Sequence, residues 1–347
     1  MTASRYRGSL VVWALLIAYA SLYPFLPLRP PSEDVLATFL ARPRYLTEAD
    51  IAFNVLAYVP LGTFATLFFR QRDRNALAIA KAVGAAAALS FALECVQLFI
   101  PNRVAQIYDF AANVGGALLG ALVFVDPVYS MATRPLGEAR ESWFIPGAWG
   151  DAGLVLTMLW LIAQLNPALP FFGAGNVGGE GMEQMVVLQW AGVAMGICGF
   201  GLFISTIMVS GALRFTLVLL SLALWLKFAA ASVMLQPHFA EDWLSTGRIG
   251  GIAVGLLAFV PLRKLDAMAR IYLALVLVLA GALFSKIFGE YSGLEELLRL
   301  FRWPHGQLAT FATLTRFLHE IWAMAALVFL VSRFIRIGRP PGARMEA

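Results

Sequence analysis

The chain has 347 residues and a formal net charge of +5; 60% of its residues are hydrophobic and only 14% are charged. Because soluble domains carry roughly 25% charged residues, this composition excludes an ordinary soluble protein and indicates an integral membrane protein surrounded by lipids. The basic residues gather at the ends of apolar runs, as membrane topology requires, so the net charge does not indicate a nucleic-acid partner.

The first third of the chain contains four apolar runs, each about long enough for a helix that crosses a membrane. These runs are Ser9–Leu28, Ile51–Phe69, Ala76–Ile100 and Ile107–Val125. The arginines Arg70, Arg72 and Arg74 separate the second run from the third and place that turn in the cytoplasm. We therefore predict a four-span transmembrane domain over residues 1–126, with the N-terminus in the cytoplasm.

The rest of the chain predicts a second membrane domain over residues 151–347, joined to the first by a cytoplasmic linker at residues 127–150. Its six apolar runs are Ala152–Phe172, Met185–Ser210, Ala212–Leu235, the shorter Ile249–Leu262, Ile271–Phe288, and a last span that opens at His319. Arg333 and Arg336 follow and place the C-terminus in the cytoplasm. The predicted fold class is thus all-α, a polytopic bundle of about ten transmembrane helices.

A group of polar residues lies at the outer end of the first domain. Glu94 and Gln97 are three residues apart, and Asp109 and Asn113 are four apart, so each pair shares one face of its helix. The short link at residues 101–106 forces an antiparallel return, which brings both faces to one end of a hairpin. Arg103 then lies within reach of Glu94 and Asp109. With Asn54, one turn inside the second span, the predicted cluster is Asn54, Glu94, Gln97, Arg103, Asp109 and Asn113.

Small residues and a proline mark where helices pack or bend. Gly116 and Gly120 continue the face of Asn113 and leave a stripe without side chains, against which another helix can approach. In the second span, Pro60 and Gly62 are expected to bend the helix or to break its ladder of hydrogen bonds.

These motifs, taken in order, resemble the signature of the VanZ-like family of membrane proteins over residues 9–126. The pieces that carry the resemblance are Asp50-Ile51-Ala52-Phe53-Asn54, Val59-Pro60-Leu61-Gly62, Glu94 with Gln97, Arg103 before Tyr108-Asp109, and Asn113 with Gly116 and Gly120. The family is named for a protein associated with resistance to the glycopeptide antibiotic teicoplanin. The resemblance implies a multi-pass protein of a bacterial cell membrane and a role in the cell envelope, possible glycopeptide resistance included.

Two interpretations of the cluster are open at this point. Its charges either neutralise one another and lock the hairpin, or bind a ligand such as a lipid-linked or cell-wall-associated molecule through a phosphate, an amine or a sugar. We favour the ligand-binding interpretation. The alternatives in other classes are a transporter or flippase of a lipid or small solute, motivated by the intramembrane Lys227, and an enzyme that modifies envelope lipids.

Catalytic, metal and cofactor chemistry receive little support from the sequence. Neither Cys95 nor Cys198 has a histidine or a second cysteine at metal-ligand spacing, and the three histidines are scattered. No serine or cysteine nucleophile has a nearby base, and no glycine-rich phosphate loop occurs. We expect no metal and no cofactor, and we favour binding over catalysis.

Overall fold

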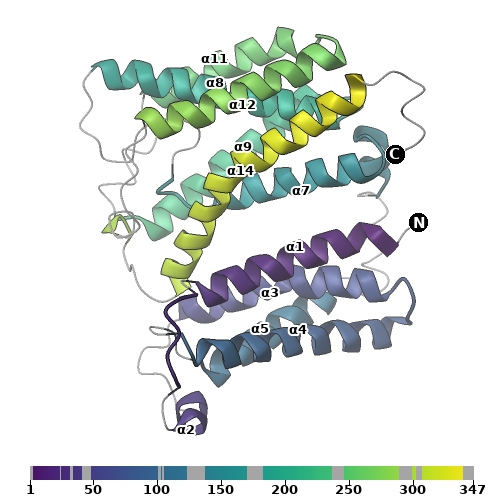
Figure 1. Ribbon diagram of the computed structural model, residues 1–347, viewed down its shortest axis with the longest axis vertical. Coiled ribbons are helices and arrows are strands. Elements are labelled where there is room, and N and C mark those ends of the chain that lie inside the picture. Colours follow the sequence, from purple (N-terminus) through teal and green to yellow (C-terminus); the bar gives the residue numbers. More distant parts are fainter. Residues whose placement is uncertain are drawn as a thin grey trace. The chain divides into compact units, whose positions relative to one another are not determined.

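The structure of the protein, a computed structural model, is built from helices (Figure 1). It describes residues 3–23, 25–31, 34–40, 48–100, 103, 105–122, 137–169, 183–236, 246–288, 299–301 and 307–338. Within these ranges the helices are α1 (Ala3–Leu22), α2 (Val35–Leu40), α3 (Glu48–Phe69), α4 (Asn75–Gln97), α5 (Ile107–Leu122), α7 (Ala148–Ala163), α8 (Glu183–Ile207), α9 (Ala212–Met234), α11 (Thr246–Leu262), α12 (Ala267–Phe288) and α14 (Gln307–Gly338).

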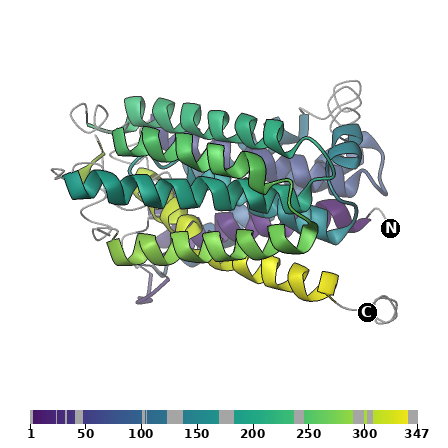
Figure 2. The same cartoon turned by 90° about the horizontal axis from the view of Figure 1, so that it is seen from above.

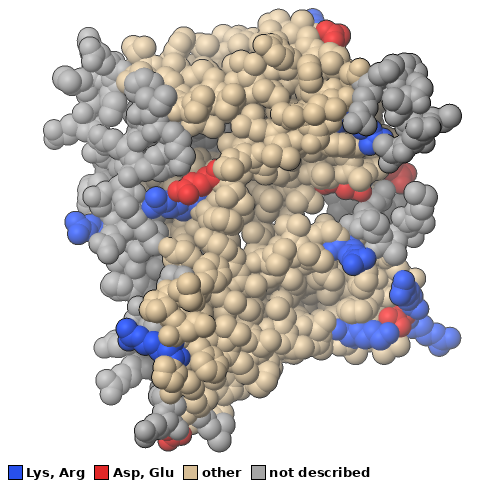
Figure 3. All heavy atoms as spheres, viewed as in Figure 1, with Lys and Arg blue, Asp and Glu red and all other residues tan. Residues whose placement is uncertain are grey.

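The all-helical membrane fold is confirmed, because each of the ten predicted spans contains a helix. In the described part of the chain, six helices are long and apolar enough to cross a membrane: α3, α4, α8, α9, α12 and α14. The remaining four, α1, α5, α7 and α11, contain shorter apolar stretches. Uncharged surface covers most of the described residues on the face drawn in Figure 3, and charged side chains are few.

Three boundaries differ from the prediction. Residues 35–40, expected to be part of a polar loop, form the short helix α2, because the Asp34 carboxylate accepts the Ala37 backbone N–H at 3.2 Å and caps it. Helix α1 ends at Leu22 rather than Leu28, since Phe25 has a φ of 65°, a left-handed conformation that a helix cannot contain. Helix α14 begins at Gln307, ahead of His319.

The chain divides into two compact units. Unit 1 comprises residues 1–138 with 305–314, and unit 2 comprises 139–304 with 315–347. The first residues of the predicted linker, 127–136, lie outside the described ranges, and the predicted domain boundaries stay predictions.

In unit 1, α5 packs closely against α3. A Cβ atom at Gly116 would overlap the carbonyl oxygen of Val55, one at Gly120 would overlap that of Val59, and one at Gly62 would overlap that of Ala117. The two helices run in the same direction, with α4 antiparallel to both. Because no side chain intervenes, the two backbones are in direct contact, the arrangement that favours helix association in lipid.

Helix α3 continues through Pro60, which the sequence analysis expected to bend or break it. Proline lacks an N–H and disturbs the carbonyls of the preceding turn. The Trp13 indole N–H of α1 donates to one of these carbonyls, that of Ala57, at 2.8 Å. The proline therefore leaves the helix intact and creates a polar link between α1 and α3.

In unit 2, α8 is the central helix. It runs alongside α11 and α12, as Figures 1 and 2 show, and 72% of its membrane-crossing window is buried. Aromatic rings surround it: Phe200 stacks on Trp160 with centroids 4.0 Å apart and lies 5.9 Å from Trp322. The Trp322 indole N–H donates to Leu156 O at 2.8 Å, so the ring is fixed as well as buried.

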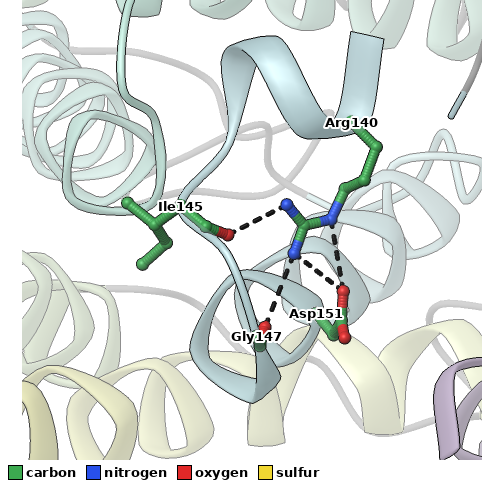
Figure 4. Close-up of polar contacts among 4 residues, drawn as sticks. All are labelled: Arg140, Ile145, Gly147 and Asp151. Atoms are coloured by element: carbon green, nitrogen blue, oxygen red, sulfur yellow. Dashed lines mark hydrogen bonds and ion pairs between the residues drawn. The ribbon is translucent and has the colours of Figure 1, made fainter. Parts of the chain in front are cut away.

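The segment that leads into α7 is held by one arginine (Figure 4). Arg140 donates to Asp151 Oδ1 from Nε at 3.2 Å and from Nη2 at 2.8 Å, and to Ile145 O from Nη1 at 2.9 Å. Ile145 N in turn donates to Ile207 O at the end of α8, at 2.9 Å. The chain before α7 is thereby attached to unit 2.

Two adjacent glycines of α5 provide a matched test of the close packing. Gly116→Ala is expected to lower the free energy of unfolding by about 1–3 kcal/mol, because its methyl group overlaps the α3 backbone. Gly115→Ala meets no atom within 4 Å and is expected to be neutral or stabilising by up to about 1 kcal/mol. Thermal unfolding of the two purified variants in detergent measures the difference. Equal melting temperatures would contradict the packing.

Candidate functional site

The site lies at one end of unit 1, where α1 and α4 end and α3 and α5 begin. All six predicted polar residues lie there or within two turns of it. Glu94, Gln97 and Asn113 are buried, whereas Asn54, Arg103 and Asp109 are half-buried. The structure therefore brings four segments of the chain to one place, and leaves part of the cluster partly exposed.

The outer layer of the site joins α3, α4 and α5. The Asn54 side chain donates from Nδ2 to Asp109 Oδ1 at 2.7 Å. The Glu94 carboxylate accepts the Gln106 backbone N–H at 2.9 Å, immediately before α5. Asp109 lies in the first turn of α5, where the helix dipole stabilises a negative charge. Both carboxylates are thus held at the N-terminus of one helix.

Arg103 and Gln97 both donate hydrogen bonds to α1, and the predicted proximity of Arg103 to Asp109 is also seen. Arg103 donates from Nη2 to Ala20 O at 3.0 Å and to Tyr23 O at 2.9 Å, and from Nε to Tyr23 O at 3.2 Å. Gln97 Nε2 donates to Ser21 O at 3.0 Å. The carbonyls at the end of a helix lack partners within the helix, so these two side chains cap α1.

The charge of Arg103 is maintained despite its surroundings. Burial lowers the pKa of the Arg103 guanidinium from its ordinary value, and the nearby Asp109 carboxylate opposes this change. Arginine stays protonated in proteins, so the group remains a cation. Asp109 is therefore its electrostatic partner even though the described hydrogen bonds go to backbone carbonyls.

An inner layer lies one helical turn deeper, and two of its members were not predicted. Asn113 Nδ2 donates to Ser90 Oγ at 3.0 Å, and the Tyr58 ring is buried in the same core. Ser90 precedes Glu94 by four residues and Tyr58 follows Asn54 by four, so the spacing rule that linked Asp109 to Asn113 identifies both. Serine and tyrosine were overlooked because each is ordinary within an apolar helix.

The inner layer contains buried polar atoms with unused hydrogen-bonding capacity. Oδ1 of Asn113 has no hydrogen-bond partner although Asn113 is only 6% exposed, and the Tyr58 hydroxyl, in a residue 2% exposed, has Ser90 as its polar neighbour. Tyr58 lies close to both Ser90 and Glu94. Buried polar groups are normally paired, so these two atoms are available to an additional donor or acceptor.

Negative charge dominates the site. The carboxylates of Asp50 and Glu94 are both near enough to Asp109 to repel it, and Arg103 is the cation that acts on it. Among the described residues, no three His, Cys, Asp or Glu side chains are placed to hold a metal ion. The arrangement can hold a positively charged or hydrogen-bond-donating group.

Residues 9–129 match the family model described as VanZ/LLP1, close to the extent expected from the motifs. Every residue of the predicted cluster lies within this match. Comparison with curated proteins and with solved structures finds no match to the chain.

The capping role of Arg103 can be tested through the end of α1. In Arg103→Ala the carbonyls of Ala20 and Tyr23 lose a charged donor, and we expect a loss of about 1–3 kcal/mol in stability. Hydrogen–deuterium exchange should become faster in the last turn of α1. Lys81→Ala, which removes an ion pair with Asp73 in which the lysine is exposed, is the control and is expected to change stability by less than about 1 kcal/mol. Unchanged exchange in α1 would contradict the role.

Proposed function

We propose that the domain at residues 9–129, which matches the VanZ/LLP1 family model, binds the polar headgroup of a lipid-linked or cell-wall-associated molecule of a bacterial envelope. The ligand would lie at the outer layer of the site, against Asp109 and Asn54. Binding there would change the response of the envelope to glycopeptide-type agents or the processing of envelope polymers.

The proposal rests on the hydrogen bonding and the partial exposure of the Asp109 carboxylate. Its carboxylate is fixed by the Asn54 amide at 2.7 Å, yet it remains half-buried at the helix ends. A charge inside a membrane domain costs about 3 kcal/mol on insertion scales, and residues that bear such a cost are functional candidates. A carboxylate that served only to join α3 and α5 would need no opening towards a ligand.

The proposal places the site on the outer side of the membrane. The α3–α4 turn, at the opposite end of unit 1, carries Arg70, Arg72 and Arg74, and basic turns stay in the cytoplasm. Both chain termini are proposed to lie in the cytoplasm on the same ground.

Labelling of single cysteines tests the sidedness. In a Cys95→Ser, Cys198→Ser background, Asn102→Cys is expected to react with a membrane-impermeant maleimide in intact cells. Arg72→Cys is expected to react only after the cells are opened. Protection of Asn102→Cys in intact cells, with labelling after lysis, would place the site in the cytoplasm and refute an outer-leaflet ligand.

Near-isosteric changes at the outer layer test the binding itself. Asp109→Asn and Glu94→Gln keep the size of each side chain and remove its charge. Each is expected to reduce co-purifying lipid or precursor by at least about tenfold, equivalent to about 1.4 kcal/mol. Native mass spectrometry of protein released from its own membrane provides the measurement.

The control for these variants is Asp73→Asn, at the other end of unit 1, which is expected to retain the wild-type ligands. Complementation of a deletion strain at equal protein level gives a second readout, the envelope phenotype. Normal ligand content and normal phenotype in the Asp109→Asn, Glu94→Gln double variant would overturn the proposed function.

A further inference from the structure

The polar atoms of the inner layer lie directly beneath the carboxylates of the outer layer. Asn113 follows Asp109 by one turn of α5, and Ser90 precedes Glu94 by one turn of α4. The bond from Asn113 Nδ2 to Ser90 Oγ, 3.0 Å long, fixes the amide and leaves its Oδ1 as an acceptor without a donor. Carboxylates and an unused carbonyl oxygen therefore follow one another along a single face.

Tyr58 completes this arrangement from the third helix. Its hydroxyl lies close to Ser90, the polar side chain it can bond to, and to Glu94. The side chain is 2% exposed, so bulk water does not satisfy the hydroxyl. We call Tyr58, Ser90, Glu94, Asp109 and Asn113 the polar column.

The charge of the polar column discriminates between possible ligand groups. A phosphate would meet the carboxylates of Glu94 and Asp109, while the described hydrogen bonds of Arg103 go to α1. A sugar hydroxyl would gain hydrogen bonds without balancing the charge. A metal ion would need carboxylates placed around it, which the described residues do not provide. An ammonium group supplies both a positive charge and three N–H donors.

We propose, on the basis of the proposed function, that the polar column binds a primary ammonium group carried by the headgroup of the ligand. Glu94 and Asp109 balance its charge, and Asn113 Oδ1 accepts one of its N–H donors. The Tyr58 hydroxyl contributes a further contact. The substrate class is thus an amine-bearing envelope lipid rather than an anionic one.

Lipids that differ only in the headgroup test this inference. The full-length protein in nanodiscs is offered phosphatidylethanolamine, phosphatidylcholine and phosphatidylglycerol with identical acyl chains, and retained lipid is measured by native mass spectrometry. Phosphatidylcholine keeps the phosphate and the positive charge but has no N–H donor. We expect phosphatidylethanolamine to be retained at least about tenfold over each of the others.

Tyr58→Phe is the informative variant, because it removes only the hydroxyl and keeps the buried ring that packs in the core. A purely structural role predicts no effect, whereas we expect the preference for phosphatidylethanolamine to fall at least about threefold. Asn113→Leu is expected to abolish the preference, and thermal unfolding shows whether that variant folds. An unchanged preference in Tyr58→Phe would overturn the assignment of this contact, and an unchanged preference in folded Asn113→Leu would overturn the polar column.

The remaining outcomes separate the inference from the proposed function. If phosphatidylethanolamine and phosphatidylglycerol are retained equally and Asp109→Asn loses both, the preference for an amine is refuted. Headgroup binding is then still supported. If the wild-type protein retains no more of any lipid than Asp109→Asn does, headgroup binding itself is refuted. Displacement of phosphatidylethanolamine by soluble ethanolamine at millimolar concentration would support the ammonium site, whereas ethanolamine binding with no retained phosphatidylethanolamine would overturn the lipid as its source.

Discussion

The direct contact between the backbones of α3 and α5 is the constraint on which the site depends. Gly116 and Gly120 carry no side chain where they meet α3, so the two helices approach until backbone carbonyls limit them. At this separation an asparagine on one helix reaches an aspartate on the other, and the Asn54–Asp109 bond of 2.7 Å is the result. A larger residue at either glycine would separate the helices and pull the two side chains apart. Packing in the apolar half of the domain thus determines the geometry of its polar end.

The polar residues at this end divide into two groups by what they contact. Gln97 and Arg103 donate to carbonyls of α1, which lack partners because the helix ends there. Most of the N–H donors of these two side chains are therefore used to hold the fold together. Asp109 and Asn113 each use one atom in a bond between helices, Oδ1 in the first case and Nδ2 in the second. The remaining oxygens of these two side chains form no bond between the described helices, and the proposed function depends on them.

The sequence predicts the helices and the shared end of the polar residues, since apolar run length and the 3.6-residue period depend on the chain alone. It predicts Arg103 near Asp109 but not the carbonyl acceptors of Arg103, because nothing in the sequence distinguishes the carbonyls that a helix end leaves free. Tyr58 and Ser90 were within reach of the same period, but neither residue is conspicuous among apolar neighbours. Helix α2 was missed because six residues between polar flanks give too short a pattern, and its capping aspartate was read as part of a loop.

Unit 2, like unit 1, contains a cationic side chain that binds carbonyl groups at the end of a neighbouring helix. The Lys227 ammonium is fully buried in α9 and donates to Asn166 O at 2.8 Å, with Gln164 Oε1 at 3.5 Å. These acceptors lie just beyond the end of α7, where free carbonyls and the helix dipole attract a cation. Arg103 does the same for α1. Lys227 and Arg103 therefore each have a structural partner at the end of a neighbouring helix. The carboxylates of unit 1 use only some of their oxygens in structural hydrogen bonds, so they are the stronger candidates for binding a ligand.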